Sequence, residues 1–155
     1  MKVYGIDIPS DIGLTNIDIE NYVSELKIPN FRGVFMRDAL PHKPKQIECG
    51  IVNLNTSNEI GSHWVCYAKT EEDFCIYFDS FGQDVLPEVL RYLKTAREYR
   101  NEIPVIARNT DIVQSINTHV CGHLCLFVLT SLMREHQPYQ QVLNTLQNGY
   151  SQANW

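Results

Sequence analysis

Apolar and polar residues along the 155-residue chain separate into strand-like runs and helix-like runs. Residues 47–54, 63–69 and 74–79 are short runs rich in aromatic and β-branched side chains, a composition typical of strands. The polar stretch 70–73 separates the last two runs and is suited to a turn. The pattern therefore predicts a β-hairpin over residues 63–79, with a further strand before it.

Residues 121–135 form a strongly apolar stretch without an internal proline. Apolar side chains recur there at helical spacing and also fill the other faces, which is the pattern of a buried helix. The stretch is too short to span a membrane. We therefore expect a helix at the centre of the protein, packed against the sheet.

Caps and helix breakers define the other elements. Thr15 can cap a helix over residues 16–26, with Asp18 three residues on in the arrangement of a capping box. Pro87 suits the first turn of a helix over about residues 85–99. These helices flank the predicted strands on both sides along the chain.

A last helix is expected after Pro138, and Gly149 is well placed to end it. Residues 103–107 read as a strand that its proline places at an edge of the sheet. Together the elements predict an α+β fold, in which a mostly antiparallel central sheet packs against the buried helix. At this length, we expect residues 1–155 to form a single domain.

The charge and the cysteines narrow the class of protein. The formal net charge is −5 and the pI is near 5.5, a poor match for phosphate backbones, so DNA is not an expected partner. Five cysteines without paired spacing suit a reducing compartment. The amino terminus lacks the apolar run of a signal peptide, and no stretch is long enough for a membrane span. We expect an intracellular protein without a membrane partner.

Four residues in a fixed order carry the candidate chemistry: His63, Asp79, Gln114 and Cys121. A thiolate attacks an acyl carbon well when a base holds its proton and donors stabilise the oxyanion. A turn centred near Glu71 would place His63 opposite Asp79, with Cβ atoms roughly 5 Å apart. The aspartate could then fix the imidazole tautomer and leave the other nitrogen for a thiol. A slip of one residue would separate the two onto opposite faces.

Cys121 is expected at the amino end of the buried helix, where free N–H groups and the helix dipole favour a thiolate. Gln114 lies in the non-helical run before it, and its carboxamide could donate to an oxyanion together with the N–H of Cys121. The sequence therefore predicts a site where the start of this helix meets the open end of the hairpin.

Each of these residues also has a structural explanation when it is taken alone: a structural or surface histidine, a small buried cysteine, a turn aspartate and a loop glutamine. A different hypothesis is a metal site, because His119, Cys121, His123 and Cys125 alternate along the chain. On a strand they would share one face. On the expected helix, residues two apart point away from each other, so no metal is expected.

The motifs as a set resemble those of the adenovirus-type maturation cysteine proteases (the adenain family), which share a fold with the SUMO and ubiquitin-like proteases. The order of a His-Trp pair, an Asp-Ser-Phe-Gly element and a Gln followed by Cys-Gly is more specific than any one of them. The matching segments are Phe31–Phe35, Cys49–Asn53, Gly61–Trp64, Phe78–Gly82, Val113–Gln114 and Cys121–Gly122.

The resemblance implies a catalytic triad of His63, Asp79 and Cys121, with Gln114 in the oxyanion hole and Trp64 lining a narrow substrate channel. It also implies cleavage of proteins after glycine-containing sites, Gly-Gly or Gly-X, through a thioester acyl-enzyme. The implied role is processing of viral capsid or core precursors in the host cell interior, nucleus or cytoplasm, and in the virion.

Two features differ from the adenovirus enzymes. No cysteine lies in residues 100–113, where the family's peptide-linking cysteine would align, so neither a disulfide-linked peptide activator nor another cofactor is expected. The aspartate at position 79, in place of glutamate, is closer to the SUMO proteases. Deconjugation of ubiquitin-like or SUMO-like modifiers is therefore the alternative function. A degenerate member that only binds such modifiers is not favoured, because the catalytic set is complete.

Overall fold

The computed structural model describes residues 1–58, 63–71, 74–95 and 105–149. Its centre is a five-stranded sheet of order β3-β4-β5-β6-β7. The strands are β3 (Phe31–Met36), β4 (Glu48–Asn53), β5 (Trp64–Glu71), β6 (Phe74–Phe78) and β7 (Val105–Arg108). A small antiparallel pair, β1 (Lys2–Val3) and β2 (Ile6–Asp7), precedes them.

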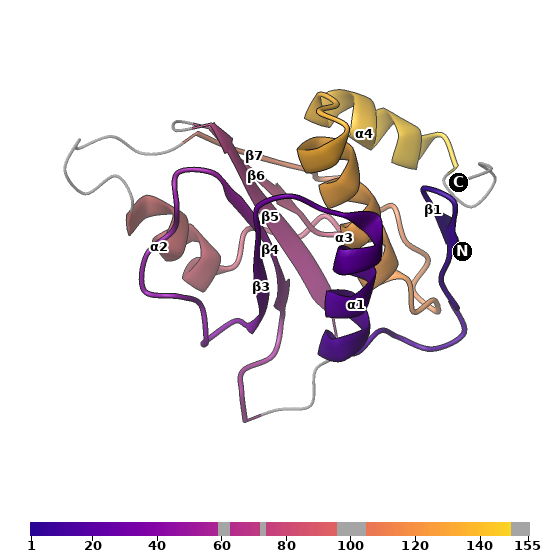
Figure 1. Ribbon diagram of the computed structural model, residues 1–155, viewed down its shortest axis with the longest axis horizontal. Coiled ribbons are helices and arrows are strands. Elements are labelled where there is room, and N and C mark those ends of the chain that lie inside the picture. The colour runs from indigo at the N-terminus through magenta and orange to yellow at the C-terminus, as the bar shows by residue number, and fades with distance from the viewer. Residues whose placement is uncertain (59–62, 72–73, 96–104, 150–155) are drawn as a thin grey trace.

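Helices cover both faces of this sheet. They are α1 (Asn16–Leu26), α2 (Pro87–Thr95), α3 (Cys121–Leu129) with its π-helical continuation η1 (Thr130–Arg134), and α4 (Tyr139–Gln147). Figure 1 shows α2 on one side of the sheet and α1, α3 and α4 on the other. The predicted α+β fold class is confirmed, with α3 as the buried helix that packs on β5.

The strands of the sheet have two buried faces. Along β5, Cys66 and Ala68 belong to the core beneath α3, whereas Val65 and Tyr67 belong to a second core beneath α2. Successive side chains of a strand point to opposite faces, so covering both faces requires apolar residues at nearly every position. This explains why the strands appear in the sequence as continuous apolar runs.

The sheet is mixed, whereas the sequence predicted a mostly antiparallel one. β5 pairs antiparallel with β4 and β6, but β3 runs parallel to β4 and β7 runs parallel to β6. Parallel neighbours need a long crossover connection, and both outer pairs have one, over residues 37–47 and through α2. Because β6 and β7 are parallel, their carboxyl ends meet at one edge of the molecule.

The register of the central hairpin differs by two residues from the predicted one. Cys66 pairs with Phe78 and Lys69 with Cys75, which places His63 opposite Phe81 rather than Asp79. A shift of two residues keeps every side chain on its expected face. His63 and Asp79 are therefore diagonal neighbours on the same face, still within reach of each other.

The local predictions agree with the observed helices. Helix α1 begins with the capping box of Thr15 and Asp18, and Gly149, at φ +93°, follows the end of α4. The predicted edge strand is β7. Of the helix predicted over about residues 85–99, α2 covers Pro87–Thr95, two residues later at its start, and residues 96–99 lie outside the described ranges. β3 was not predicted. Among the described residues, no helix has the length and apolar content required to cross a membrane.

Candidate active site

A pocket of about 840 Å³ lies where the start of α3 meets the end of β5 that begins at Trp64. Its walls come from the segment before α1, from β3, from the end of β4 and from residues 114–121. His63, Trp64, Gln114 and Cys121 all line it, so the fold brings four of the five predicted site residues to one place. Asp79, the fifth, contacts His63.

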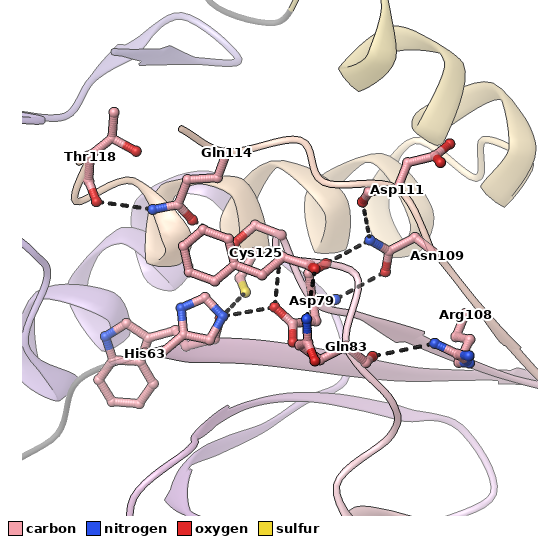
Figure 2. Close-up of polar contacts among 12 residues, drawn as sticks. His63, Asp79, Gln83, Arg108, Asn109, Asp111, Gln114, Thr118 and Cys125 are labelled. Carbon is pink, nitrogen blue, oxygen red and sulfur yellow. Dashed lines mark hydrogen bonds and ion pairs between the residues drawn. The ribbon is translucent and has the colours of Figure 1, made fainter. Parts of the chain in front are cut away.

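The imidazole of His63 is bound to the carboxylate of Asp79. Nε2 of His63 lies 2.8 Å from Oδ1 of Asp79, and the two residues are 8% and 2% exposed (Figure 2). His63 directly precedes β5 and Asp79 directly follows β6, so both lie at the same end of the antiparallel pair. Since Nε2 is taken by the carboxylate, Nδ1 is the nitrogen that remains for Cys121.

Cys121 and Asp79 both contribute to the pKa of His63. Burial alone lowers the pKa of His63, but the hydrogen bonds to Asp79 and to the Cys121 side chain, with the charges of both groups, raise it to about 9. The imidazole can thus keep its proton at neutral pH while it faces the sulfur. A cysteine next to a protonated imidazole is the arrangement of an activated nucleophile.

The backbone around Cys121 supplies free donors. Helix α3 begins at Cys121, and Val120 before it provides no side-chain cap. The first backbone bond of the helix runs from the N–H of Leu124 to the carbonyl of Val120. The N–H groups at positions 121–123 therefore precede the first helical bond and can bind an anion beside the sulfur.

Gln114 is held by two hydrogen bonds. Its Oε1 accepts from the hydroxyl of Ser80 at 2.5 Å, and its Nε2 donates to the carbonyl of Thr118 at 3.1 Å. Figure 2 shows the second contact. The side chain is nearly buried yet lines the pocket together with Cys121. The predicted oxyanion donor and the predicted nucleophile thus line the same pocket.

Trp64 lies in the wall of the pocket. Its Nε1 donates to the carbonyl of Leu14 at 2.9 Å, which fixes the ring against the segment before α1. A Cβ added at Gly122 would meet both Leu14 and Trp64 at 3.3 Å. The backbone at Gly122, next to Cys121, therefore packs closely against these two side chains, and Trp64 also lines the pocket.

Two contacts that hold the His63–Asp79 pair were missed by sequence reasoning. The ring of Phe81 stacks on the imidazole at a centroid distance of 4.8 Å. Asn109 clamps the main chain of Asp79: its Oδ1 accepts from the Asp79 N–H at 3.0 Å, and its Nδ2 donates to the Asp79 carbonyl at 2.6 Å (Figure 2). Asn109 directly follows β7, which runs parallel to β6. Its contact with Asp79 could have been predicted only from this parallel pairing, which the sequence pattern did not reveal.

The competing metal hypothesis finds no support in the described ranges. Because residues 121–125 are helical, the alternating His and Cys side chains disperse, and no group of three or more potential ligands gathers there or elsewhere in the described part of the chain. Nε2 of His123 donates to the carbonyl of Pro9 instead. The other four cysteines are free and buried, as expected of core positions: Cys49, Cys66, Cys75 and Cys125.

The family model described as adenovirus endoprotease matches residues 31–153. No curated protein sequence matches the chain.

Two crystal structures of the ASFV pS273R protease, one of them the Se-Met form, have a similar fold. Their TM-scores are 0.60 and 0.53, at 17% sequence identity in both cases. The similarity covers 87% of this chain but 62% and 63% of those chains, so this chain spans less than two thirds of their length. The likeness at this identity is one of fold.

The raised pKa of His63 predicts how its ring titrates. We expect a midpoint near pH 9 in a nuclear magnetic resonance titration of the intact chain, and a lower midpoint in Asp79→Asn, which removes the carboxylate that raises the pKa. His123, whose pKa burial lowers, is the internal reference and should not respond to this substitution.

The same shift predicts a stability change. Because the folded pKa of His63 exceeds its ordinary 6.5, protonation stabilises the fold fully below about pH 6.5, and this contribution is lost as the pH rises through about 9. A wild-type midpoint at or below pH 6.5 would contradict both statements.

The clamp by Asn109 predicts a stability loss in Asn109→Ala. The substitution leaves the buried N–H of Asp79 without its partner, whereas the Asp79 carbonyl keeps the hydrogen bond from the N–H of Gly82. An unsatisfied buried group costs about 1–3 kcal/mol, so we expect a loss of about 1–3 kcal/mol in urea unfolding. Asn148→Ala, at an exposed position, is the control and should change stability by less than about 0.5 kcal/mol. Equal losses in the two variants would show that the clamp does not hold Asp79.

Proposed function

Because this chain belongs to the adenovirus endoprotease family, we propose that it is a cysteine endopeptidase with Cys121 as its nucleophile. His63 acts as the general acid and base, and Asp79 orients it. The observation that carries the proposal is the series of side-chain hydrogen bonds from Asp79 through His63 to Cys121, at the wall of a pocket. This series performs the tasks that thiol catalysis requires.

In the first half of the reaction, the Cys121 thiolate forms a bond to the carbonyl carbon of the substrate, and the carbonyl π electrons move to the oxygen. The resulting tetrahedral oxyanion accepts hydrogen bonds from the N–H of Cys121 and from Nε2 of Gln114. His63 then gives its proton to the leaving amine. The C–N bond breaks, and a thioester between Cys121 and the acyl fragment remains.

In the second half, a water molecule enters the position that the amine has left. His63, now neutral, removes a proton from this water as the water oxygen attacks the thioester carbon. The second tetrahedral intermediate collapses and expels the Cys121 thiolate, which releases a carboxylic acid. The imidazolium and the thiolate are thereby regenerated. Asp79 keeps the His63 ring in one tautomer and orientation through both halves.

We propose that the cleavage sites contain glycine, as Gly-Gly or Gly-X. The support is steric: Trp64 is fixed by its bond to Leu14, and both side chains lie within van der Waals reach of a Cβ built on Gly122, next to the nucleophile. An acyl group that reaches Cys121 beside this wall fits best when it has no bulky side chain.

The proposed natural substrates are capsid or core precursor proteins of a virus or virus-like element, cleaved inside the host cell and in the assembling particle. The family match supports this role, and the structural neighbours are themselves named as viral proteases. The five free, buried cysteines are consistent with a reducing environment. We propose no cofactor.

The nucleophile is tested by cleavage of aminocoumarin peptides ending in Leu-Arg-Gly-Gly, beside ubiquitin and SUMO fluorophore conjugates. We expect Cys121→Ala to abolish cleavage and His63→Ala to reduce it almost as far, since the two act as a unit. Cys75→Ala, which alters a buried cysteine facing α2, is the matched control and should remain active. If the enzyme strongly preferred an intact ubiquitin or SUMO conjugate to the peptides, its function would be deconjugation of modifiers and not maturation of viral precursors.

The oxyanion role predicts a loss of on the order of 10²–10³ in turnover for Gln114→Ala on the same peptides. Gln141→Ala, on the exposed face of α4, removes the same side chain outside the pocket and should have full activity. If Gln114→Ala were as active as Gln141→Ala, another group would have to stabilise the oxyanion.

A further inference from the structure

Ser80 is a buried hydroxyl that the catalytic steps above do not use. It directly follows Asp79 after strand β6 and is 0% exposed. Its hydroxyl donates to Oε1 of Gln114 at 2.5 Å, and its own carbonyl accepts from the N–H of Val113 at 2.9 Å. Ser80 thus holds the segment 113–114 by both its side chain and its main chain.

The two bonds to the Gln114 carboxamide determine which way the group faces. The carbonyl of Thr118 can only accept, so it selects the orientation in which Nε2 lies beside it. In that orientation Oε1 faces the Ser80 hydroxyl, which donates to it. One N–H of Nε2 is used by Thr118, and the described part of the chain offers no acceptor for the second.

Without the Ser80 hydroxyl, the carboxamide would keep one of its two anchors. The terminal torsion of glutamine is soft, so a single hydrogen bond does not determine the plane of the amide. An oxyanion donor must lie at hydrogen-bond distance from the position that the charged oxygen takes in the transition state. The geometry therefore ties the alignment of the Gln114 donor to Ser80.

We propose that Ser80 is a positioning residue for the oxyanion hole: its hydroxyl fixes the Gln114 carboxamide so that the second N–H of Nε2 is available at Cys121. The inference rests on the proposed function, in which Gln114 stabilises the oxyanion. It assigns two tasks to consecutive residues of one turn. Asp79 orients the base His63, and Ser80 orients the donor Gln114.

Two small reagents separate this role from a general structural role. With p-nitrophenyl acetate, the Cys121 sulfur bonds to the carbonyl carbon, the π electrons form an oxyanion, and collapse expels p-nitrophenolate. With iodoacetamide, the sulfur displaces iodide from a saturated carbon, and no oxyanion forms. The ratio of the two rates at Cys121 therefore reports on oxyanion stabilisation, whereas damage to the thiolate or to His63 slows both reactions.

The experiment measures both rates on the intact chain for wild type, Ser80→Ala, Gln114→Ala and the double variant, with Cys121→Ala as the blank. We expect Ser80→Ala to slow acylation about tenfold, the effect of one hydrogen bond, and to leave alkylation unchanged. In the Gln114→Ala background, Ser80→Ala should cause no further loss, because the group that it positions is absent.

Ser131→Ala is the matched control. Ser131 is also 0% exposed and also hydrogen-bonded, at 2.6 Å to the hydroxyl of Tyr4, but it belongs to η1 and lies outside the pocket. This variant should keep the wild-type ratio of rates at a similar loss of thermal stability. Ser80→Thr keeps the hydroxyl and should also keep the ratio, even if its extra methyl group lowers stability.

Three outcomes would overturn the inference. They are an unchanged ratio in Ser80→Ala, an equal fall of both rates, or a full further loss in the Gln114→Ala background. An unchanged ratio in Ser80→Ala beside a reduced ratio in Gln114→Ala would reject the role of Ser80 alone. If Gln114→Ala also kept the wild-type ratio, the oxyanion role of Gln114 in the proposed function would fail as well.

Discussion

The turn from Asp79 to Gly82 at the end of β6 is the constraint on which the rest of the site depends. It is closed by a hydrogen bond from the N–H of Gly82 to the carbonyl of Asp79 at 2.8 Å, and the N–H of Phe81 donates to Oδ1 of Asp79 at 2.9 Å. Gly82 has φ +66°, and a Cβ there would overlap the carbonyl of Thr110, so only glycine fits. Four consecutive residues thereby orient a carboxylate, an amide donor and an aromatic ring without a flexible link between them.

Burial strengthens the hydrogen bonds of this turn, but it also requires every buried polar group in it to have a partner. A buried carboxylate must be paired, because the loss of water is not otherwise compensated. Among the described residues, two carboxylates are buried in this way, and they have different partners. Glu48, at 0% exposure, accepts from Arg32, from two tyrosine hydroxyls and from the N–H of Lys45, so it ties strands and loops together. Asp79 instead binds an imidazole that faces a pocket. The partner, and not the burial, separates the structural carboxylate from the one that we propose to act in catalysis.

The parallel pairing of β6 and β7 supplies hydrogen-bond partners for the buried main chain of Asp79. β7 runs beside β6 in the same direction, so Asn109 arrives at the end of β6 and satisfies the main chain of Asp79, 30 residues before it. An antiparallel β7 would present its opposite end there. The same edge of the sheet meets the start of α3, where the N–H groups at positions 121–123 precede the first helical hydrogen bond, next to the proposed nucleophile Cys121. The direction of β7 and the direction of α3 thus bring hydrogen-bond donors, the Asn109 amide and the N–H groups at the start of α3, to the same end of the sheet.

Local interactions explain what could be predicted from the sequence alone. The capping box of α1, the apolar helix that begins at Cys121, the strands and the His63–Asp79 pair on one face of a hairpin all follow from residues that are close along the chain. The hairpin prediction survived a register error because an even shift preserves the faces.

Only the tertiary structure decided the mixed pairing of the sheet and the contacts that orient the site. Ser80 meets Gln114 across 34 residues, and Asn109 meets Asp79 across 30. Neither contact has a periodic or compositional signature, because a buried polar side chain finds its partner through the packing of distant segments rather than through its neighbours in sequence. The sequence by itself determined the chemical groups and their local frames, and long-range strand pairing decided how those groups are aimed.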